Sequence, residues 1–289
     1  MTAIDLPDEG PGHPASPDLA ARRTQMAGTV AAGLFATRRP PREEMLGGVR
    51  VLRFAPDGAA RGLVLHLHGG GFRQGAPEFA GPFAEALAAR CGVEVVVPQY
   101  RLAPEHPFPA GVTDALAVLR ALADEAGDLP LIVSGDSAGG GLAAGLGLWS
   151  AAHAGPRLAG LVLLSPWLDL TVSAPSYAAN AASDPLFSRE AAQEASALYL
   201  QGGDPRHPLA SPLFAPLSGL PPCLVSVGAG EVLRDDAEAF HAALEAAGVA
   251  SHLRVVEGMD HVAVVRGSNL PGAAQTFDQV AAFIEAAIG

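Results

Sequence analysis

The stretch that decides the fold is LIVSGDSAGGGLAAGL at residues 131–146. Its first four residues form an apolar run typical of a buried strand, and its last five are typical of a helix. The Gly-Asp-Ser-Ala-Gly between them must therefore turn the chain sharply, and little besides glycine fits on either side of the serine in such a turn. The turn would lift the hydroxyl of Ser137 above the sheet edge, in front of the positive end of the helix dipole. The stretch predicts a nucleophilic serine on a strand-turn-helix unit.

A second glycine-rich segment, HGGGF at residues 68–72, follows another apolar run upstream. Three consecutive glycines cost unfolded-state entropy and pack no side chain, so an ordinary tight turn is a poor explanation for them. A loop whose backbone N–H groups must approach an oxyanion does need them. We expect His68 to orient this loop by hydrogen bonding rather than to act as a base. A G-x-S-x-G pattern alone is weak evidence, and the upstream loop makes it specific.

Together with other segments in the same order, these motifs resemble the hormone-sensitive-lipase-like branch of the α/β-hydrolases, bacterial carboxylesterases with an HGGG loop. The other segments are YRLAPEHPFPA at 100–110, SPWLDL at 165–170, DPLF at 184–187, SPL at 211–213 and GMDH at 258–261. The resemblance extends from His68 to His261. It implies an α/β-hydrolase fold, a helical cap, an ester substrate and often a homodimer.

Apolar strand-like runs alternate with helix-like segments, which predicts βαβ units and a mainly parallel central sheet flanked by helices. The strand candidates are Val49–Phe54, Gly62–His66, Val93–Val97, Leu131–Ser134, Leu161–Leu164, Cys223–Val227 and His252–Val256. The helix candidates among them are Phe83–Arg90, Val112–Ala123, Leu142–Ala152, Ala237–Ala247 and Thr276–Ala287. In such sheets the site lies at the carboxyl ends of the strands, and the motifs follow strands as that rule requires.

Two regions fall outside this alternation. Residues 1–17 are punctuated by prolines and predict an irregular arm, after which Asp18 could cap a helix to about Thr37. Residues 171–220 are rich in proline and glycine around a helix-like stretch at 189–200. By resemblance, residues 1–45 and 171–210 form the cap, and residues 46–170 and 211–289 form the core.

The base that activates the serine should follow it in the chain, since the order in this fold is serine, acid, histidine. We expect His261 to be that base, because it follows the last predicted strand. The other downstream histidines fit poorly: His241 falls in a helix, His252 in a strand, and His153 and His207 at exposed or cap positions.

The acid that holds the histidine is Glu231 by resemblance. Relatives place an aspartate at the first position of a D-P-L-x-D-like motif, and the matching segment here is EVLRD at 231–235, with Glu231 lying 30 residues before His261. Asp235 and Asp236 compete on chemistry, although both suit the start of the helix at Ala237. Asp260 adjoins His261, but neighbouring side chains usually diverge.

The resemblance also implies the oxyanion hole and a pocket. Backbone N–H groups of Gly70, Gly71 and Ala138 would bind the oxyanion. The candidate pocket walls are Phe72, Trp167, Phe187, Leu213, Phe214 and Val262, each of which could equally serve core packing.

Composition excludes other classes of function. A length of 289 residues with 49% hydrophobic residues suits one large core, and a net charge of −12 argues against nucleic acid and anionic membranes as partners. All 18 basic residues are arginines, which excludes a phosphate-binding P-loop lysine, a Schiff-base lysine and a Ser-Lys dyad. Cys91 and Cys223 predict buried core thiols rather than a disulfide framework.

We expect neither metal nor organic cofactor. His66 and His68 share one strand face, but no convergent acidic or cysteine residues join them. Gly139, Gly140 and Gly141 mimic a dinucleotide motif, yet they lie inside the helix rather than in the preceding turn. Asp136, Glu105 and Asp114 are read as structural. The acidic first residues and the lack of a long apolar run favour a soluble, cytoplasmic protein.

The sequence therefore predicts a serine carboxylesterase for short- to medium-chain esters, with Ser137, His261 and Glu231 as its triad. A lactone or carbamate hydrolase would use the same machinery. The alternative that is not an enzyme is a small-molecule receptor on a hydrolase scaffold, like the plant gibberellin receptor. Such receptors typically lose the catalytic histidine, which is present here as His261.

Overall fold

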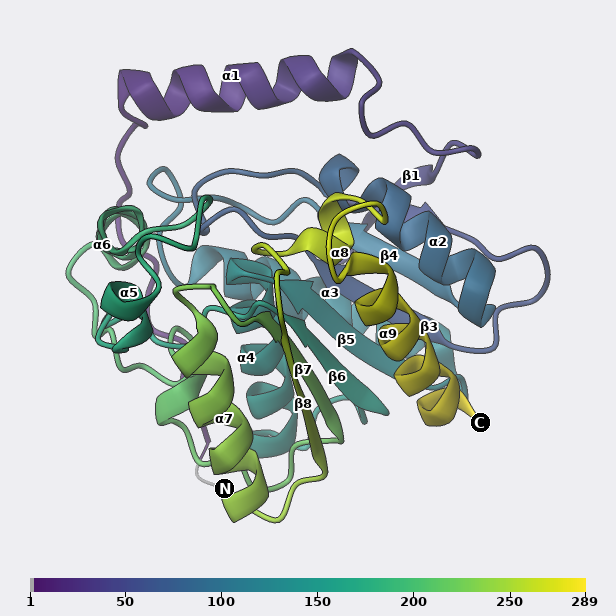
Figure 1. Cartoon of the computed structure of the whole chain (residues 1–289). Coiled ribbons are helices and arrows are strands. Elements are labelled where there is room, and N and C mark those ends of the chain that lie inside the picture. The colour runs from purple at the N-terminus through teal and green to yellow at the C-terminus, as the bar shows by residue number, and fades with distance from the viewer. Residues whose placement is uncertain (1–2) are drawn as a thin grey trace.

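An eight-stranded sheet forms the centre of the molecule in the computed structural model, which describes residues 3–289 (Figure 1). The strands are β1 (Arg42–Leu46), β2 (Val49–Phe54), β3 (Leu63–Leu67), β4 (Glu94–Pro98), β5 (Leu131–Asp136), β6 (Gly160–Leu164), β7 (Cys223–Gly228) and β8 (Ser251–Val256). Their order is β1-β2-β4-β3-β5-β6-β7-β8. β2 pairs antiparallel with β1 and β4, and the other neighbours are parallel. The prediction of a mainly parallel sheet flanked by helices is confirmed.

Both faces of the sheet are covered, so its central strands are apolar at nearly every position. Leu63 and Leu65 of β3 pack on one face, and Val64 packs on the other. The first face is covered by α3 (Ala110–Ala126), α4 (Ala138–Ala152) and α7 (Arg234–Ala246), and the second by α2 (Gly81–Cys91) and α9 (Ala273–Ile288) (Figure 1). Cys223 and Cys91 are buried free thiols in these two layers, as the sequence predicted.

Helix α1 (Pro17–Ala31) spans the top of the molecule, and α5 (Ser176–Ala179) and α6 (Arg189–Leu200) lie below its left-hand end (Figure 1). Arg23 anchors α1 to loops after β3 and β4: its guanidinium donates to both oxygens of Glu105, at 2.7 and 3.0 Å, and to the carbonyls of Arg73 and Ala103. Glu105 therefore has the structural role predicted for it. The helices above the sheet lie at the edge where the parallel strands end.

The start and end of α1 differ from the prediction. Ser16, not Asp18, is its N-cap and accepts from the backbone N–H of Leu19, because Pro17 occupies the first helical position, which proline favours. The helix ends at Ala31 rather than near Thr37, and Gly33 follows with a φ of 78°. Leu19 is the only residue of this helix that is buried.

Strand β1 was not predicted, because its sequence REEML carries three charged residues and reads as polar loop. In the fold these charges have partners. The buried guanidinium of Arg53 on β2 meets the carboxylates of Glu44, Glu94 and Glu125. Charged side chains also keep this edge of the sheet from pairing with another chain.

The five helices predicted around the sheet all begin earlier than predicted, by two residues in α2 and α3, three in α7 and α9, and four in α4. Helix α4 starts at Ala138 rather than Leu142, since its glycines lower the sequence signal for a helix but permit close packing. Helix α7 starts at Arg234 rather than Ala237. The remaining additions are the short helices α5, α8 (Ala263–Arg266), η1 (Pro77–Ala80) and η2 (Pro212–Phe214). Within residues 3–289, no helix combines the length and hydropathy needed to cross a membrane.

We predict that Gly139→Ala lowers the free energy of unfolding by about 3 kcal/mol, because overpacking that forces backbone apart is costly. A Cβ at Gly139 would lie 2.0 Å from the carbonyl oxygen of Leu67, a backbone atom of β3. Urea unfolding followed by circular dichroism measures the change. Gly28→Ala in α1 is the matched control: its Cβ would meet nothing within 4 Å, so stability should stay equal or rise by up to about 1 kcal/mol. Equal stability of both variants would contradict the packing argument.

Candidate active site

Ser137 sits on a strained turn between β5 and α4, with a φ of 54° and a ψ of −121°. A non-glycine residue rarely adopts a positive φ, and such strain concentrates at functional sites. The flanking glycines are required by space: a Cβ at Gly135 would lie 2.1 Å from the carbonyl oxygen of Gly139. The backbone of Ser137 is held by its N–H, which donates to Leu164, and by its carbonyl, which accepts from Trp167. The predicted strand-turn-helix unit is present in this geometry.

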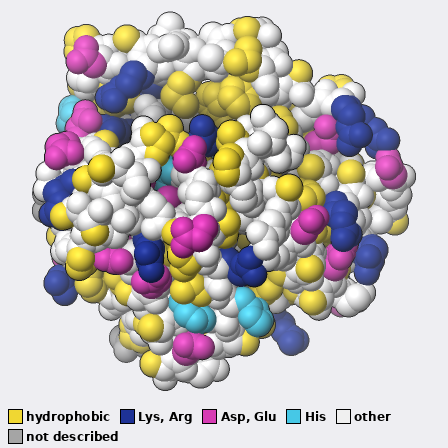
Figure 2. Space-filling model, in the orientation of Figure 1, with side chains coloured by type: hydrophobic (Ala, Val, Ile, Leu, Met, Phe, Trp, Pro, Cys, Tyr) yellow, Lys and Arg dark blue, Asp and Glu magenta, His cyan; other side chains and the backbone are white. Residues whose placement is uncertain are grey.

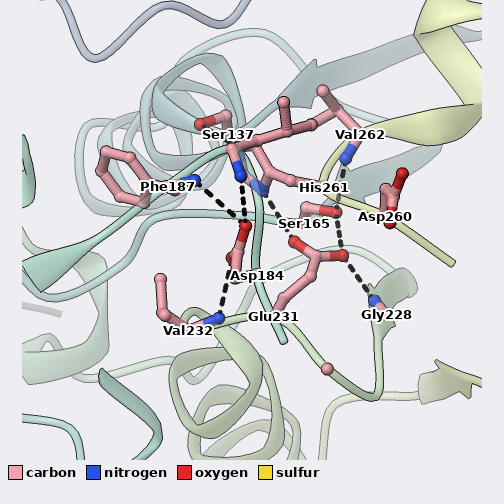
Figure 3. Close-up of polar contacts among 12 residues, drawn as sticks. Ser137, Ser165, Asp184, Phe187, Gly228, Glu231, Val232, Asp260, His261 and Val262 are labelled. Atoms are coloured by element: carbon pink, nitrogen blue, oxygen red, sulfur yellow. Dashed lines mark hydrogen bonds and ion pairs between the residues drawn. The ribbon is translucent and has the colours of Figure 1, made fainter. Parts of the chain in front are cut away.

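The side chains of Ser137, His261 and Glu231 form one hydrogen-bonded chain (Figure 3). The hydroxyl oxygen of Ser137 lies 2.9 Å from Nε2 of His261, and Nδ1 of His261 lies 2.7 Å from Oε2 of Glu231. All three residues are buried. A carboxylate can only accept, so Nδ1 carries the proton and Nε2 is left to accept from the serine. The structure thus brings the three predicted residues together in the order that activates a hydroxyl.

The competing carboxylates bind elsewhere. Asp235 accepts from the backbone N–H of Ser176 at 2.8 Å, and Asp236 accepts from those of Leu168 and Asp169, each at 3.0 Å. Burial raises the pKa of Asp236 to about 8. Asp260 lies outside the hydrogen-bonded chain and faces Arg266 at 4.0 Å (Figure 3). Asp235 and Asp236 occupy the first turn of α7, yet their carboxylates hold neighbouring loops instead of capping that helix.

Ser165 supports the acid and was not predicted to do so. Its hydroxyl donates to Oε1 of Glu231 at 2.7 Å and accepts from the backbone N–H of Val262 at 3.2 Å. Oε1 also accepts from the N–H of Gly228 at 2.5 Å. With Oε1 occupied in this way, Oε2 is presented to His261. The SPWLDL segment was visible in the sequence, but a serine after a buried strand has no distinctive chemical signal.

The electrostatics of His261 favour its charged form. Burial lowers the pKa of His261, but the hydrogen bond and charge of Glu231, with smaller contributions from Asp184 and Asp136, outweigh it. The net pKa lies above the ordinary 6.5. A raised pKa makes the imidazole a stronger proton acceptor, but it also means that the imidazole becomes protonated at a higher pH than an ordinary histidine.

The glycine-rich loop after β3 lies against the serine. A Cβ at Gly69 would lie 2.4 Å from Oδ2 of Asp136 and 3.2 Å from Cβ of Ser137. Gly70 and Gly71 have φ values of 123° and 62°, which favour glycine. Ala138 is the first residue of α4, so its N–H has no acceptor one turn earlier in the helix. These observations bring the three predicted oxyanion donors into the neighbourhood of Ser137.

His68 makes contacts within this loop and with Tyr100. Its ring stacks on Tyr100 with centroids 4.3 Å apart, and the hydroxyl of Tyr100 donates to the carbonyl of His68 at 2.7 Å. Burial lowers the pKa of His68. His66 lies 3.2 Å from the carboxylate of Asp136, in keeping with a structural role for both. Among residues 3–289 no cluster of three or more His, Cys, Asp or Glu is arranged to hold a metal ion.

Aromatic side chains connect the loop to the histidine. The ring of Phe72 lies 5.6 Å from that of Trp167, Trp167 lies 5.4 Å from Phe187, and Phe187 stacks on His261 at 5.8 Å. Leu213 and Phe214 lie in η2, where Phe214 packs under the guanidinium of Arg206. Of the six predicted pocket residues, Phe72, Trp167 and Phe187 form one aromatic group, in which Phe187 contacts His261 while Phe72 and Trp167 are buried in the core. Figure 2 shows further hydrophobic side chains gathered below the ridge of α1.

Comparisons with known proteins find relatives that match most of this chain. A family model described as the alpha/beta hydrolase fold matches residues 64–265. An acetyl-hydrolase of Streptomyces hygroscopicus is 38% identical over 229 residues, which are 78% of this chain and 76% of that protein. An esterase of Acinetobacter venetianus is 38% identical over 244 residues, 82% of this chain and 79% of that protein.

Solved structures are similar over nearly the whole chain. A hormone-sensitive lipase from a metagenome library superposes with a TM-score of 0.88 at 37% identity, covering 96% of this chain and 93% of that one. The esterase EstE5, soaked with ethyl alcohol, gives a TM-score of 0.87 at 33% identity, covering 96% and 94%.

We predict that the reactivity of Ser137 falls as the pH drops through a midpoint above 6.5, the ordinary pKa of histidine. Only neutral His261 can accept the serine proton, and its pKa is raised, so protonation removes the base at a higher pH than usual. The rate of inactivation by a neutral sulfonyl fluoride, measured from pH 5 to 9, reports this midpoint without any substrate. A midpoint at or below 6.5 would mean that burial outweighs the carboxylates.

Proposed function

Since the chain belongs to the hormone-sensitive-lipase-like esterases of the α/β-hydrolase fold, we propose that Ser137, His261 and Glu231 are its catalytic triad and that short- to medium-chain carboxylic esters are its substrates. The observation that carries the proposal is the hydrogen-bonded chain from Oγ of Ser137 through the imidazole to Glu231. That arrangement is what an unactivated hydroxyl needs to attack an ester.

In the first half-reaction the oxygen of Ser137 bonds to the ester carbonyl carbon while its proton passes to Nε2 of His261. The C=O electrons move onto the carbonyl oxygen and give a tetrahedral oxyanion. Collapse of this intermediate breaks the bond to the alcohol oxygen, which leaves with the proton held by His261. Glu231 keeps the imidazole in the required tautomer and stabilises the imidazolium through the 2.7 Å contact.

In the second half-reaction a water molecule replaces the alcohol. His261 takes a proton from it as it attacks the acyl-enzyme, and returns that proton to Oγ of Ser137 when the acid departs. We assign the oxyanion in both steps to the N–H groups of Gly70, Gly71 and Ala138. The positive φ values of the two glycines and the first-turn position of Ala138 support this assignment.

The preference for shorter acyl chains follows from what surrounds the triad. Phe187 stacks on His261 and contacts Trp167, and α6 approaches the glycine loop so closely that a Cβ at Gly71 would lie 3.4 Å from that of Ala195. Residues 1–45 and 171–210 would form the cap that encloses the ester. One relative is named an acetyl-hydrolase, which agrees with a small acyl group.

Two further properties belong to the same proposal. The resemblance to family members supports a homodimer. Two buried free thiols suit a reducing compartment such as the cytoplasm.

We predict hydrolysis of p-nitrophenyl esters with kcat/KM highest for short acyl chains and falling as the chain lengthens. Ser137→Ala should lower the rate by at least about 10^4-fold, since the nucleophile is lost while the fold is kept. The measurement is the rate of nitrophenolate release, followed by its absorbance, for a series of esters that differ in acyl length. Lactone or carbamate turnover far above that of simple esters would displace the ester proposal. Tight ligand binding without turnover would favour the receptor.

We predict that Glu231→Gln lowers kcat by about 10²- to 10⁴-fold, because an amide at this position disturbs the tautomer of His261. Asp235→Asn is the matched control, and it should keep activity within about threefold because its carboxylate binds Ser176 rather than the imidazole. Steady-state kinetics on the best ester compares the two. A large loss of activity in Asp235→Asn together with a small loss in Glu231→Gln would assign the acid to Asp235 instead of Glu231.

A further inference from the structure

Asp184 lies buried in the turn between α5 and α6, and its carboxylate accepts three backbone N–H groups. Oδ1 accepts from Leu186 and Phe187, each at 3.0 Å, within its own segment. Oδ2 accepts from Val232 at 3.0 Å, in the loop that carries Glu231 (Figure 3). One side chain thus joins two segments that lie 48 residues apart in sequence.

Residues 180–184 also form hydrogen bonds with the rest of the loop that carries Glu231. The amide of Asn180 donates to the carbonyl of Glu231 at 2.7 Å and to that of Ala229 at 3.3 Å. The hydroxyl of Ser183 donates to the carbonyl of Gly230 at 2.8 Å. Together with the bond from Val232 to Asp184, these contacts hold the backbone of residues 229–232 on both sides of the acid.

Asp184 also determines what covers the base. By accepting from the N–H of Phe187 it fixes the start of the chain leading to α6, and the ring of Phe187 stacks on His261 with an interplanar angle of 14°. Phe187 also makes an edge-to-face contact with Trp167, with ring centroids 5.4 Å apart. The carboxylate of Asp184 therefore bonds both the loop that carries Glu231 and the residue whose ring stacks on His261.

We infer that Asp184 is a positioning residue for the reaction: it couples residues 171–210 to the triad by fixing both the backbone beside Glu231 and the ring over His261. The inference rests on the proposed function of the triad. It deepens that function, because the segment that encloses the substrate would also hold the acid in place.

The charges around His261 give this role a distinctive readout. Glu231 faces the imidazole from the loop after β7, Asp136 from the end of β5, and Asp184 from residues 171–210. Asp260 precedes His261 in its loop, and Arg266 at the end of α8 donates to the carbonyl of His261 at 3.4 Å. Asp184, Glu231 and Asp136 each raise the pKa of His261, so removing the charge of Asp184 should lower it.

We predict that Asp184→Asn lowers kcat by about 10- to 100-fold, as loss of a supporting hydrogen bond does in other sites, while KM changes by less than about threefold. The amide keeps the shape of the side chain, but it cannot accept all three N–H groups with the same strength. The acid limb of the pH profile of kcat/KM should also move to lower pH. Kinetics on a short p-nitrophenyl ester from pH 5 to 9 measure both effects.

Asp235→Asn is the matched control for this variant. Its carboxylate also bonds a backbone N–H of residues 171–210, that of Ser176, yet it lies away from His261. The control should leave both kcat and the pH midpoint unchanged. If Asp184 had a purely structural role, Asp184→Asn would lower stability and activity but leave the midpoint of the pH profile unchanged, and that result would overturn the inference. Kinetics of Asp184→Asn equal to those of the wild type would overturn it as well.

Asn180→Ala provides a second test if Asp184→Asn fails to fold. It removes the two amide bonds to the acid loop and keeps the charge of Asp184, so kcat should fall while the midpoint stays. An unchanged kcat would show that residues 171–210 do not hold the acid. Failure of the proposed function would give a different result, because the Ser137→Ala variant would then hydrolyse the ester as fast as the wild type.

Discussion

The close passage of α4 under the ends of β3 and β5 is the constraint on which the site depends. The first turn of the helix comes so near that a side chain at Gly139 would collide with β3, and one at Gly135 would collide with Gly139. The chain can make this passage only by forcing Ser137 to a positive φ. The strain is maintained because the surrounding core is close-packed on both faces of the sheet. The position of the Ser137 hydroxyl, 2.9 Å from the imidazole of His261, is the local consequence of how the core is packed.

The rest of the triad comes from loops, which need other means of being held. His261 and Glu231 follow β8 and β7, and each strand fixes only where its loop begins. Ser165, after β6, links the two loops by bonding the carboxylate of one and the backbone of the other. Residues 180–184 add four bonds to the acid loop from above the sheet. The rigid elements aim the loops, and buried polar contacts complete their positions.

The sequence was informative where one residue type is physically required. The glycines around Ser137 and the apolar alternation of strands and helices predicted the sheet, and chain order led to His261. It was uninformative where the requirement is shared by many residues, as for Ser165, whose hydroxyl gains a role only through contacts far along the chain. Strand β1 was missed because its charged residues look like exposed polar residues until the fold gives them partners, as Glu44 finds in Arg53 of β2. Short helices such as α5 and α8 carry too few residues for a periodic pattern.

The acid shows how the fold accommodates a departure from its relatives' pattern. A glutamate in place of the family's aspartate reaches one methylene further and has one more rotatable bond, and ordering such a side chain costs up to about 2 kcal/mol. Hydrogen bonds to a charged group contribute about 1.5–3 kcal/mol each. Oε1 of Glu231 accepts two, from Ser165 and Gly228, before Oε2 meets the imidazole. These two bonds offset the ordering cost of the longer side chain and fix Oε1, which leaves Oε2 facing His261.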